Sequence, residues 1–207
     1  MKIRALFFVT ALLPTMCVST LAYSKDQQML KVATFNVSME ATNYKSLDMP
    51  PSNKVLQHVL STGEHPQVKN IAEIIQRVNP DILMLNEFDY IADKRKGVEA
   101  FIKNYLNVSQ RGLKPVDYPY TYVAPVNTGE PTTFDLDNNG KAEGIGGDAY
   151  GFGLYPGQYG MALLSKYPID VESIRTFQTF KWHHMPHPQV PIIPDENGNV
   201  DNGTPWY

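Results

Sequence analysis

One helix between two apolar strands constrains the fold more than any other feature of the sequence. Apolar residues recur at helical spacing in this segment: Val68, Ile71, Ile74, Ile75 and Val78. Pro66 in the first turn and Asn79-Pro80 after the last turn predict a helix over about 66–78. Before it, Leu30–Val37 (LKVATFNV) alternates as a strand does, and after it Ile82–Leu85 is a continuous apolar run, typical of a strand buried on both faces. This order predicts an α/β domain rather than a helical bundle.

Weaker patterns extend this organisation along the rest of the chain. Further helices are predicted over about Asn53–Leu60 and Lys96–Leu106, and further strands over Tyr120–Pro125, Met161–Ser165 and Val171–Phe180. Eight glycines fall between positions 140 and 160, which predicts a loop there. From position 185 onward the chain is rich in proline and asparagine and shows no periodicity.

The first 24 residues have the pattern of a secretory signal peptide. Lys2 and Arg4 give a positive start, Ala5–Leu13 is apolar, and Ala22-Tyr23-Ser24 fits a cleavage site. The alternative is a membrane anchor, but the apolar run is shorter than the roughly 20 residues that span a bilayer. We therefore predict an exported protein, periplasmic or secreted, whose mature chain covers residues 25–207 and has no membrane span.

The charge balance bears on the class of partner. Without Lys2 and Arg4 the chain has 16 basic residues against 21 acidic ones, a net charge of −5. A protein that grips a nucleic-acid backbone without sequence preference usually carries a basic face, and no basic run occurs here. Nucleic acid is therefore possible as a substrate but is not favoured by the charge. We also expect the protein to be a monomer.

Two strand ends carry the residues best suited to chemistry. Asn36 ends the first apolar strand, and Glu87 follows the second. Ligands of layered α/β folds collect beyond strand ends, and a carboxylate there suits a hard cation such as Mg²⁺. An adjacent amide can hold a phosphate oxygen or orient that carboxylate. Taken singly, Asn36 is more often a turn residue and Glu87 a solvated strand end.

Four segments, in this order, resemble the endonuclease/exonuclease/phosphatase superfamily. They are Ala33–Val37 (ATFNV), Pro80–Asp89 (PDILMLNEFD), Tyr159–Ile169 (YGMALLSKYPI), and Thr179–Trp182 (TFKW) followed by Met185-Pro186. The last of these is similar to exported bacterial members. The resemblance covers the chain from Leu30 to its end.

The resemblance implies a four-layer α/β sandwich of two mixed sheets flanked by helices. It implies hydrolysis of phosphate esters, either phosphodiesters, as in the nucleases of the family, or phosphomonoesters. Glu87 would hold Mg²⁺ or Mn²⁺, and Asn36 would position the phosphate or the metal.

The sequence departs from the family pattern at its C-terminal end. The family's Gly-Asp-x-Asn segment and Ser-Asp-His terminus do not occur, and the adjacent His183 and His184 are poor substitutes because neighbouring side chains diverge. We therefore expect residues 25–207 to be the N-terminal portion of such a domain, with an incomplete sandwich and no activity alone. The competing hypothesis is a non-catalytic, calcium-stabilised exported binding module with the same framework.

The segment Asp135–Gly140 (DLDNNG) resembles the first half of a calcium-binding loop. Asp135, Asp137 and Asn139 supply oxygen atoms at alternate positions before a glycine. The glutamate that completes such a loop is absent, since Gly146 occupies its place, although Glu143 lies near it in sequence. A structural Ca²⁺ ion and an Asx-rich turn therefore both remain open.

Overall fold

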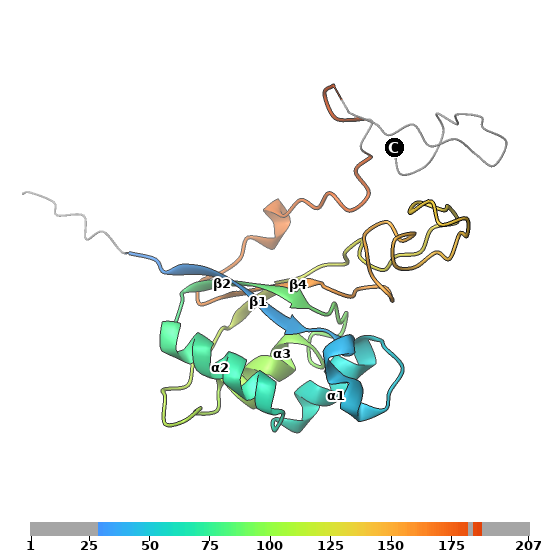
Figure 1. Cartoon of the computed structure of the whole chain (residues 1–207). Coiled ribbons are helices and arrows are strands. Elements are labelled where there is room, and N and C mark those ends of the chain that lie inside the picture. Colours follow the sequence, from blue (N-terminus) through green and yellow to red (C-terminus); the bar gives the residue numbers. More distant parts are fainter. Residues whose placement is uncertain (1–28, 182–183, 188–207) are drawn as a thin grey trace, which may run out of the picture.

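A computed structural model describes residues 29–181 and 184–187, so the predicted signal peptide lies outside the described residues. It shows one four-stranded sheet in the spatial order β1-β2-β4-β3 (Figure 1). β1 and β2 are parallel, and β4 is antiparallel to both of its neighbours. The strands are β1 (Val32–Met39), β2 (Ile82–Phe88), β3 (Tyr120–Val123) and β4 (Met161–Ser165).

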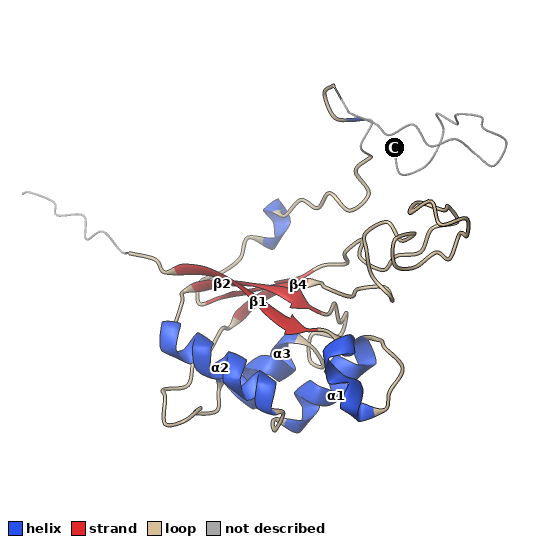
Figure 2. Ribbon diagram, in the orientation of Figure 1, coloured by secondary structure: helices blue, strands red, loops and turns tan. Residues whose placement is uncertain are grey.

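Helices α1, α2 and α3 cover one face of this sheet (Figure 2). The helical elements are η1 (Ala41–Leu47), α1 (Asn53–Thr62), α2 (Pro66–Val78), α3 (Val98–Phe101), η2 (Ile102–Leu106) and η3 (Val171–Ser173). The helix predicted over 96–106 is α3 continued by η2, a π-helical turn. Within the described ranges, no helix combines the length and the apolar character needed to cross a bilayer.

Helix α2 has the predicted bounds but a narrower apolar face. Pro66 begins it, and Asn79 ends it in a left-handed conformation with its N–H donated to the carbonyl of Ile75. Val68, Ile71 and Ile75 are buried, whereas Ile74 is 47% exposed and Val78 44% exposed. Each residue advances about 100° around a helix, so Ile74 and Ile75 cannot both face the same strand.

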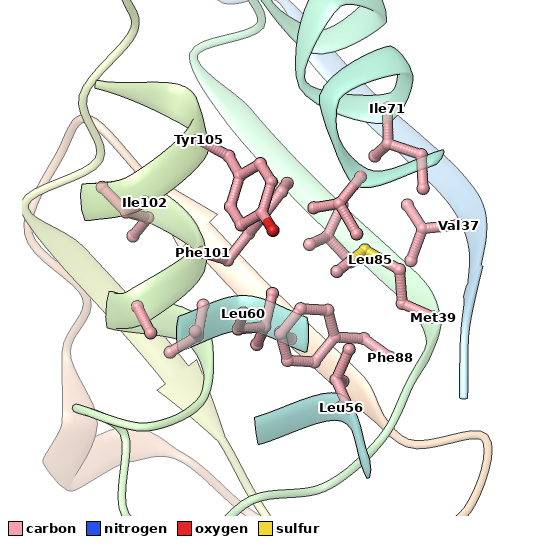
Figure 3. Packing of buried hydrophobic residues seen from close by; sticks show 14 of the residues in the cluster. Val37, Met39, Leu56, Leu60, Ile71, Leu85, Phe88, Phe101, Ile102 and Tyr105 are labelled. Atoms are coloured by element: carbon pink, nitrogen blue, oxygen red, sulfur yellow. The ribbon is translucent and has the colours of Figure 1, made fainter. Parts of the chain in front are cut away.

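The core lies between the helices and one face of the sheet. Leu83 and Leu85 of β2 are buried in it. Leu85 points from the strand toward the side where Phe101 of α3 and Tyr105 of η2 lie (Figure 3). Burying each such side chain contributes roughly 1.5–3 kcal/mol. This packing fixes β2, and therefore the position at which β2 ends.

The opposite face of the sheet is largely open, which corrects two predictions. The described residues form a single sheet, so the four-layer sandwich with a second sheet is not seen. β2 was also predicted to be buried on both faces, but Ile82 and Met84 are only partly buried. The reason is that the helices lie on one side only, and Met161 on the other side remains 48% exposed.

The prediction of a strand over Val171–Phe180 is wrong. Its first residues form the short helix η3, and the following residues make no strand. β4 already has a partner on each side, so the segment that follows it finds no free edge there. Residues 175–178 instead line one side of a hollow over the open face.

A long loop, residues 124–160, connects β3 to β4 and projects beyond the sheet (Figure 1). We call it the glycine-rich loop. Isolated backbone bridges join its two arms, Thr128 with Gly151 and Pro131 with Ala149. At Gly153 a Cβ atom would lie 2.6 Å from the nitrogen of Gly129, so only glycine permits the two arms to approach this closely.

Candidate functional site

The sheet brings Asn36 and Glu87 close to the carboxyl ends of two neighbouring strands, although β1 continues beyond Asn36 to Met39. Asn36 pairs with Asn86 across the parallel strands, and Glu87 is the next residue of β2. Asn36 is exposed and Glu87 is half-buried. The register between β1 and β2 shifts just beyond this pair, between Asn36 and Met39. The two predicted residues therefore lie side by side at the carboxyl edge of the parallel pair.

Ser38 connects these two side chains. Its hydroxyl lies 3.4 Å from Oδ1 of Asn36 and 3.4 Å from Oε2 of Glu87, and its backbone N–H donates to the same Oδ1. Ser38 and Glu87 both have positive φ, 48° and 54°, values uncommon for residues other than glycine. The backbone strain of this left-handed conformation persists only where surrounding contacts hold it, and strained residues of this kind concentrate at functional sites. Sequence reasoning did not identify Ser38.

Two buried carboxylates follow the strand ends and were also missed. Glu40 and Asp89 lie just beyond β1 and at the end of β2, and both are almost completely buried. Oδ2 of Asp89 accepts hydrogen bonds from the Tyr155 hydroxyl at 2.7 Å and from the N–H of Ala41 at 3.2 Å. A polar residue directly after an apolar strand was the available signal, since Asp89 ends the segment PDILMLNEFD.

Burial has the largest effect on the ionisation of Asp89. It raises the pKa of Asp89 to about 7; the hydrogen bond from Tyr155 opposes the shift, and the negative charge of Glu40 adds to it. Burial likewise raises the pKa of Tyr155, and Asp89 raises it further, so the hydroxyl stays protonated and acts as a donor. The buried hydrogen bond between Tyr155 and Asp89 therefore connects the end of β2 to the glycine-rich loop.

Tyr159 completes this edge from the side of the glycine-rich loop. It follows Gln158, whose amide donates to Glu40, and it lines the hollow over the open face. Burial raises the pKa of Tyr159, and the negative charges of Glu40, Glu87 and Asp89 raise it further. The phenol of Tyr159 is thus close enough to all three carboxylates for their charges to act on it.

A second acidic group lies within the glycine-rich loop. Ligand oxygens of Asp135, Asp137 and Asp148 lie within 4.8 Å of one another. Three carboxylates are the donors that a hard cation such as Ca²⁺ prefers. Asp148 was not predicted, because it comes 11 residues after Asp137 and the loop must fold back to bring it in. The amide of Asn139 donates to Asp137.

Asp148 also supports the loop without any ion. Its Oδ1 accepts the N–H groups of Leu136 and Asp137, and its Oδ2 accepts that of Glu143. The hydrogen bond from Glu143, followed by those from the other two residues, holds the pKa of Asp148 below its usual range. Asp148 therefore stays ionised, as a metal ligand must.

The histidines in the described ranges lie outside the acidic group of the glycine-rich loop. None of them belongs to a group of His, Asp and Glu side chains that could share a metal ion. His183 lies outside the described residues; His184 is exposed, and its ring packs edge-on against Phe180. His65 packs against Tyr44 at the start of α2, with ring centroids 4.9 Å apart.

Comparison with known proteins gives one result. The sequence profile of a family described as "Endonuclease/Exonuclease/phosphatase family" matches residues 33–207, which include every side chain of the strand-end site. No curated protein and no solved structure matches the chain significantly.

Proposed function

The chain belongs to the endonuclease/exonuclease/phosphatase family, and we propose that its strand-end site takes part in metal-dependent hydrolysis of phosphate esters. The observation that carries this proposal is the contact of Ser38 with both Asn36 and Glu87 at the ends of two parallel strands. Members of the family are typically phosphoesterases, and the arrangement supplies an oxygen site of the kind that their chemistry requires.

The residues present fit a divalent metal such as Mg²⁺ or Mn²⁺. Mg²⁺ is commonly held by one or two carboxylates, with water and substrate phosphate completing its shell. Glu87 is half-buried at a strand end, so its carboxylate is both oriented and reachable from solvent. When bound, the metal would polarise the phosphoryl group and stabilise the leaving oxygen.

The roles of the chain's own residues follow from their contacts. Glu87 would hold the metal, and Ser38 would fix the orientation of that carboxylate. Asn36 has its Oδ1 turned toward Ser38, so its amide nitrogen remains as a donor for a phosphate oxygen. Calorimetric titration with Mn²⁺ tests this proposal: binding that disappears in Glu87→Ala supports it, and unchanged binding contradicts it.

A structural calcium ion in the glycine-rich loop is the second proposal. Asp135, Asp137 and Asp148 would hold it, with Asn139 beside them. This group also favours the alternative function, a calcium-stabilised binding module without catalysis. Binding of Ca²⁺ to the loop together with no Mn²⁺ binding at Glu87 would decide for that alternative.

The open face of the sheet motivates a structural proposal. An apolar hollow of about 510 Å³ lies over it, with Met84, Met161 and Leu163 among its lining residues. We propose that a second sheet packs on this face, giving the four-layer sandwich that the family resemblance implies. A crystal structure of the protein in which this face stays exposed to solvent would contradict this idea.

Export is proposed on the sequence pattern at positions 1–24. Secreted or periplasmic material should then begin near Lys25. Protein that retains Met1 after export would argue against cleavage.

A further inference from the structure

Tyr159 adopts a backbone conformation that a bulky residue rarely takes. Its φ is 54°, in the left-handed region, where the Cβ atom of any L-residue is crowded. A glycine would adopt the same conformation without this cost. The backbone geometry alone therefore gives no reason for an aromatic residue at this position.

The residues on both sides of Tyr159 hold it there. Gln158 is completely buried, and its Nε2 donates a 2.8 Å hydrogen bond to Oε2 of Glu40. The carbonyl of Gly160 accepts the N–H of Phe88 at 3.0 Å, and a Cβ atom at Gly160 would lie 2.7 Å from the carbonyl oxygen of Phe88. Position 159 is thus fixed between the ends of β1 and β2.

The side chain at this fixed position borders two different environments. It lines the apolar hollow over the open face. Its backbone lies opposite the end of β2, because the N–H of Phe88, the residue after Glu87, donates to the carbonyl of Gly160, the residue after Tyr159. A phenol near the carboxylate proposed to hold the metal would offer a hydrogen-bond donor to a phosphoryl oxygen, an acceptor, bound there.

We propose that Tyr159 contacts the substrate: its phenol donates a hydrogen bond to a non-bridging oxygen of the phosphoryl group bound at Glu87. This inference rests on the proposed phosphoesterase function and adds a donor from the glycine-rich loop to the donors at the strand ends. The backbone strain at position 159 is then the cost of presenting that donor.

The test is the affinity for phenylphosphonate, a non-hydrolysable phosphate-ester analogue, in saturating Mg²⁺. Tyr159→Phe keeps the ring and removes only the hydroxyl, so the dissociation constant should rise about tenfold, the loss typical of a hydrogen bond to a charged group. The matched control is Tyr150→Phe, because Tyr150 is an exposed tyrosine of the same loop; its affinity should not change.

Tyr159→Gly separates a binding role from a structural one. Glycine relieves the left-handed strain, which offsets part of the lost packing of the ring. This variant should therefore remain folded in a melting scan and yet bind phenylphosphonate at least as weakly as Tyr159→Phe. Wild-type affinity in Tyr159→Phe would overturn the inference. If Glu87→Ala still weakens binding in that case, the proposed function stands without it, whereas a wild-type protein that binds no phenylphosphonate in Mg²⁺ overturns both.

Discussion

Gln158 and Glu40 are 118 positions apart in the sequence, yet Nε2 of Gln158 donates a 2.8 Å hydrogen bond to Oε2 of Glu40 in the interior. Oε1 of Gln158 accepts the N–H of Leu154, so both ends of the amide are used. Together with the bond between Tyr155 and Asp89, this contact joins the glycine-rich loop to the ends of β1 and β2. The loop and the strand ends therefore form one structural unit.

Removing this contact should destabilise the protein. Gln158→Ala leaves the carboxylate of Glu40 buried without one of its donors, which costs about 1–3 kcal/mol of unfolding free energy. Urea unfolding of the variant measures this loss. Gln57→Ala, the same chemical change at a half-buried position of α1, should change the unfolding free energy by less than about 0.5 kcal/mol. Equal losses of unfolding free energy in the two variants would show that the hydrogen bond between Gln158 and Glu40 does not stabilise the protein.

Changes at the strand ends should weaken metal binding in a graded order. Glu87→Ala removes the proposed ligand and should abolish measurable Mn²⁺ binding at this site. Ser38→Ala removes only a hydroxyl 3.4 Å from the Glu87 carboxylate, so affinity should fall about tenfold. Electron paramagnetic resonance of free Mn²⁺ gives both values. A Ser38→Ala protein that binds as weakly as Glu87→Ala would mean that Ser38 is itself a ligand.

The sequence predicted the parts of the fold that depend on local pattern. α2 (Pro66–Val78) and β4 (Met161–Ser165) have the predicted bounds, because periodicity and turn residues mark their ends. The segment over 171–180 was predicted as a strand and is not one, since pairing depends on a free sheet edge rather than on alternation.

The residues of the candidate site also differ in whether a local sequence pattern could identify them. Asn36 and Glu87 could be proposed from the sequence because each lies at or just after the end of an apolar run. The network of Asp89 with Tyr155 was not visible, because its partners are 66 positions apart and meet only after the glycine-rich loop has folded back. The loop folds back because its two arms pair with each other, and no local sequence pattern specifies this pairing.

Calcium should stabilise the glycine-rich loop if its carboxylates bind the ion. Ca²⁺ at 100 times its dissociation constant would add about 2.7 kcal/mol to the unfolding free energy. Asp137→Ala removes one exposed ligand without touching the backbone hydrogen bonds to Asp148, so it should abolish the calcium-dependent rise in melting temperature. Identical melting curves in calcium and in EDTA for the wild type would exclude the ion.

Acid should weaken the start of α2 through His65. Burial lowers the pKa of this histidine, and its Nδ1 is buried with no hydrogen-bond partner among the described residues. The folded state therefore disfavours the protonated ring, so this contribution to stability is complete above the unfolded pKa of about 6.5 and is lost as pH falls through it.

His65→Phe keeps an aromatic ring against Tyr44 and removes the titrating group. Urea unfolding at pH 7.5 and pH 5 should show a smaller acid loss in this variant than in the wild type. His58→Phe, at an exposed position of α1, should retain the wild-type loss. An acid loss unchanged by His65→Phe would place its origin elsewhere.

Gly160 should tolerate no side chain, because of its contacts with the end of β2. A Cβ atom there would lie 2.7 Å from the carbonyl oxygen of Phe88 and 2.8 Å from the nitrogen of Tyr90. Both atoms belong to backbone that cannot rotate away, so Gly160→Ala must displace the strand end that carries Glu87. We expect a loss of about 1–3 kcal/mol, typical of overpacking, together with weaker Mn²⁺ binding.

Gly112→Ala separates this steric effect from the cost of backbone strain. Gly112 has a φ of +80°, but a Cβ atom there would meet nothing within 4 Å. Its substitution should therefore cost only the left-handed penalty of about 1–2 kcal/mol and leave Mn²⁺ affinity unchanged. The two variants can thus lose similar stability while only Gly160→Ala loses metal. If both retain full Mn²⁺ affinity, the contact between Gly160 and β2 does not control the position of Glu87.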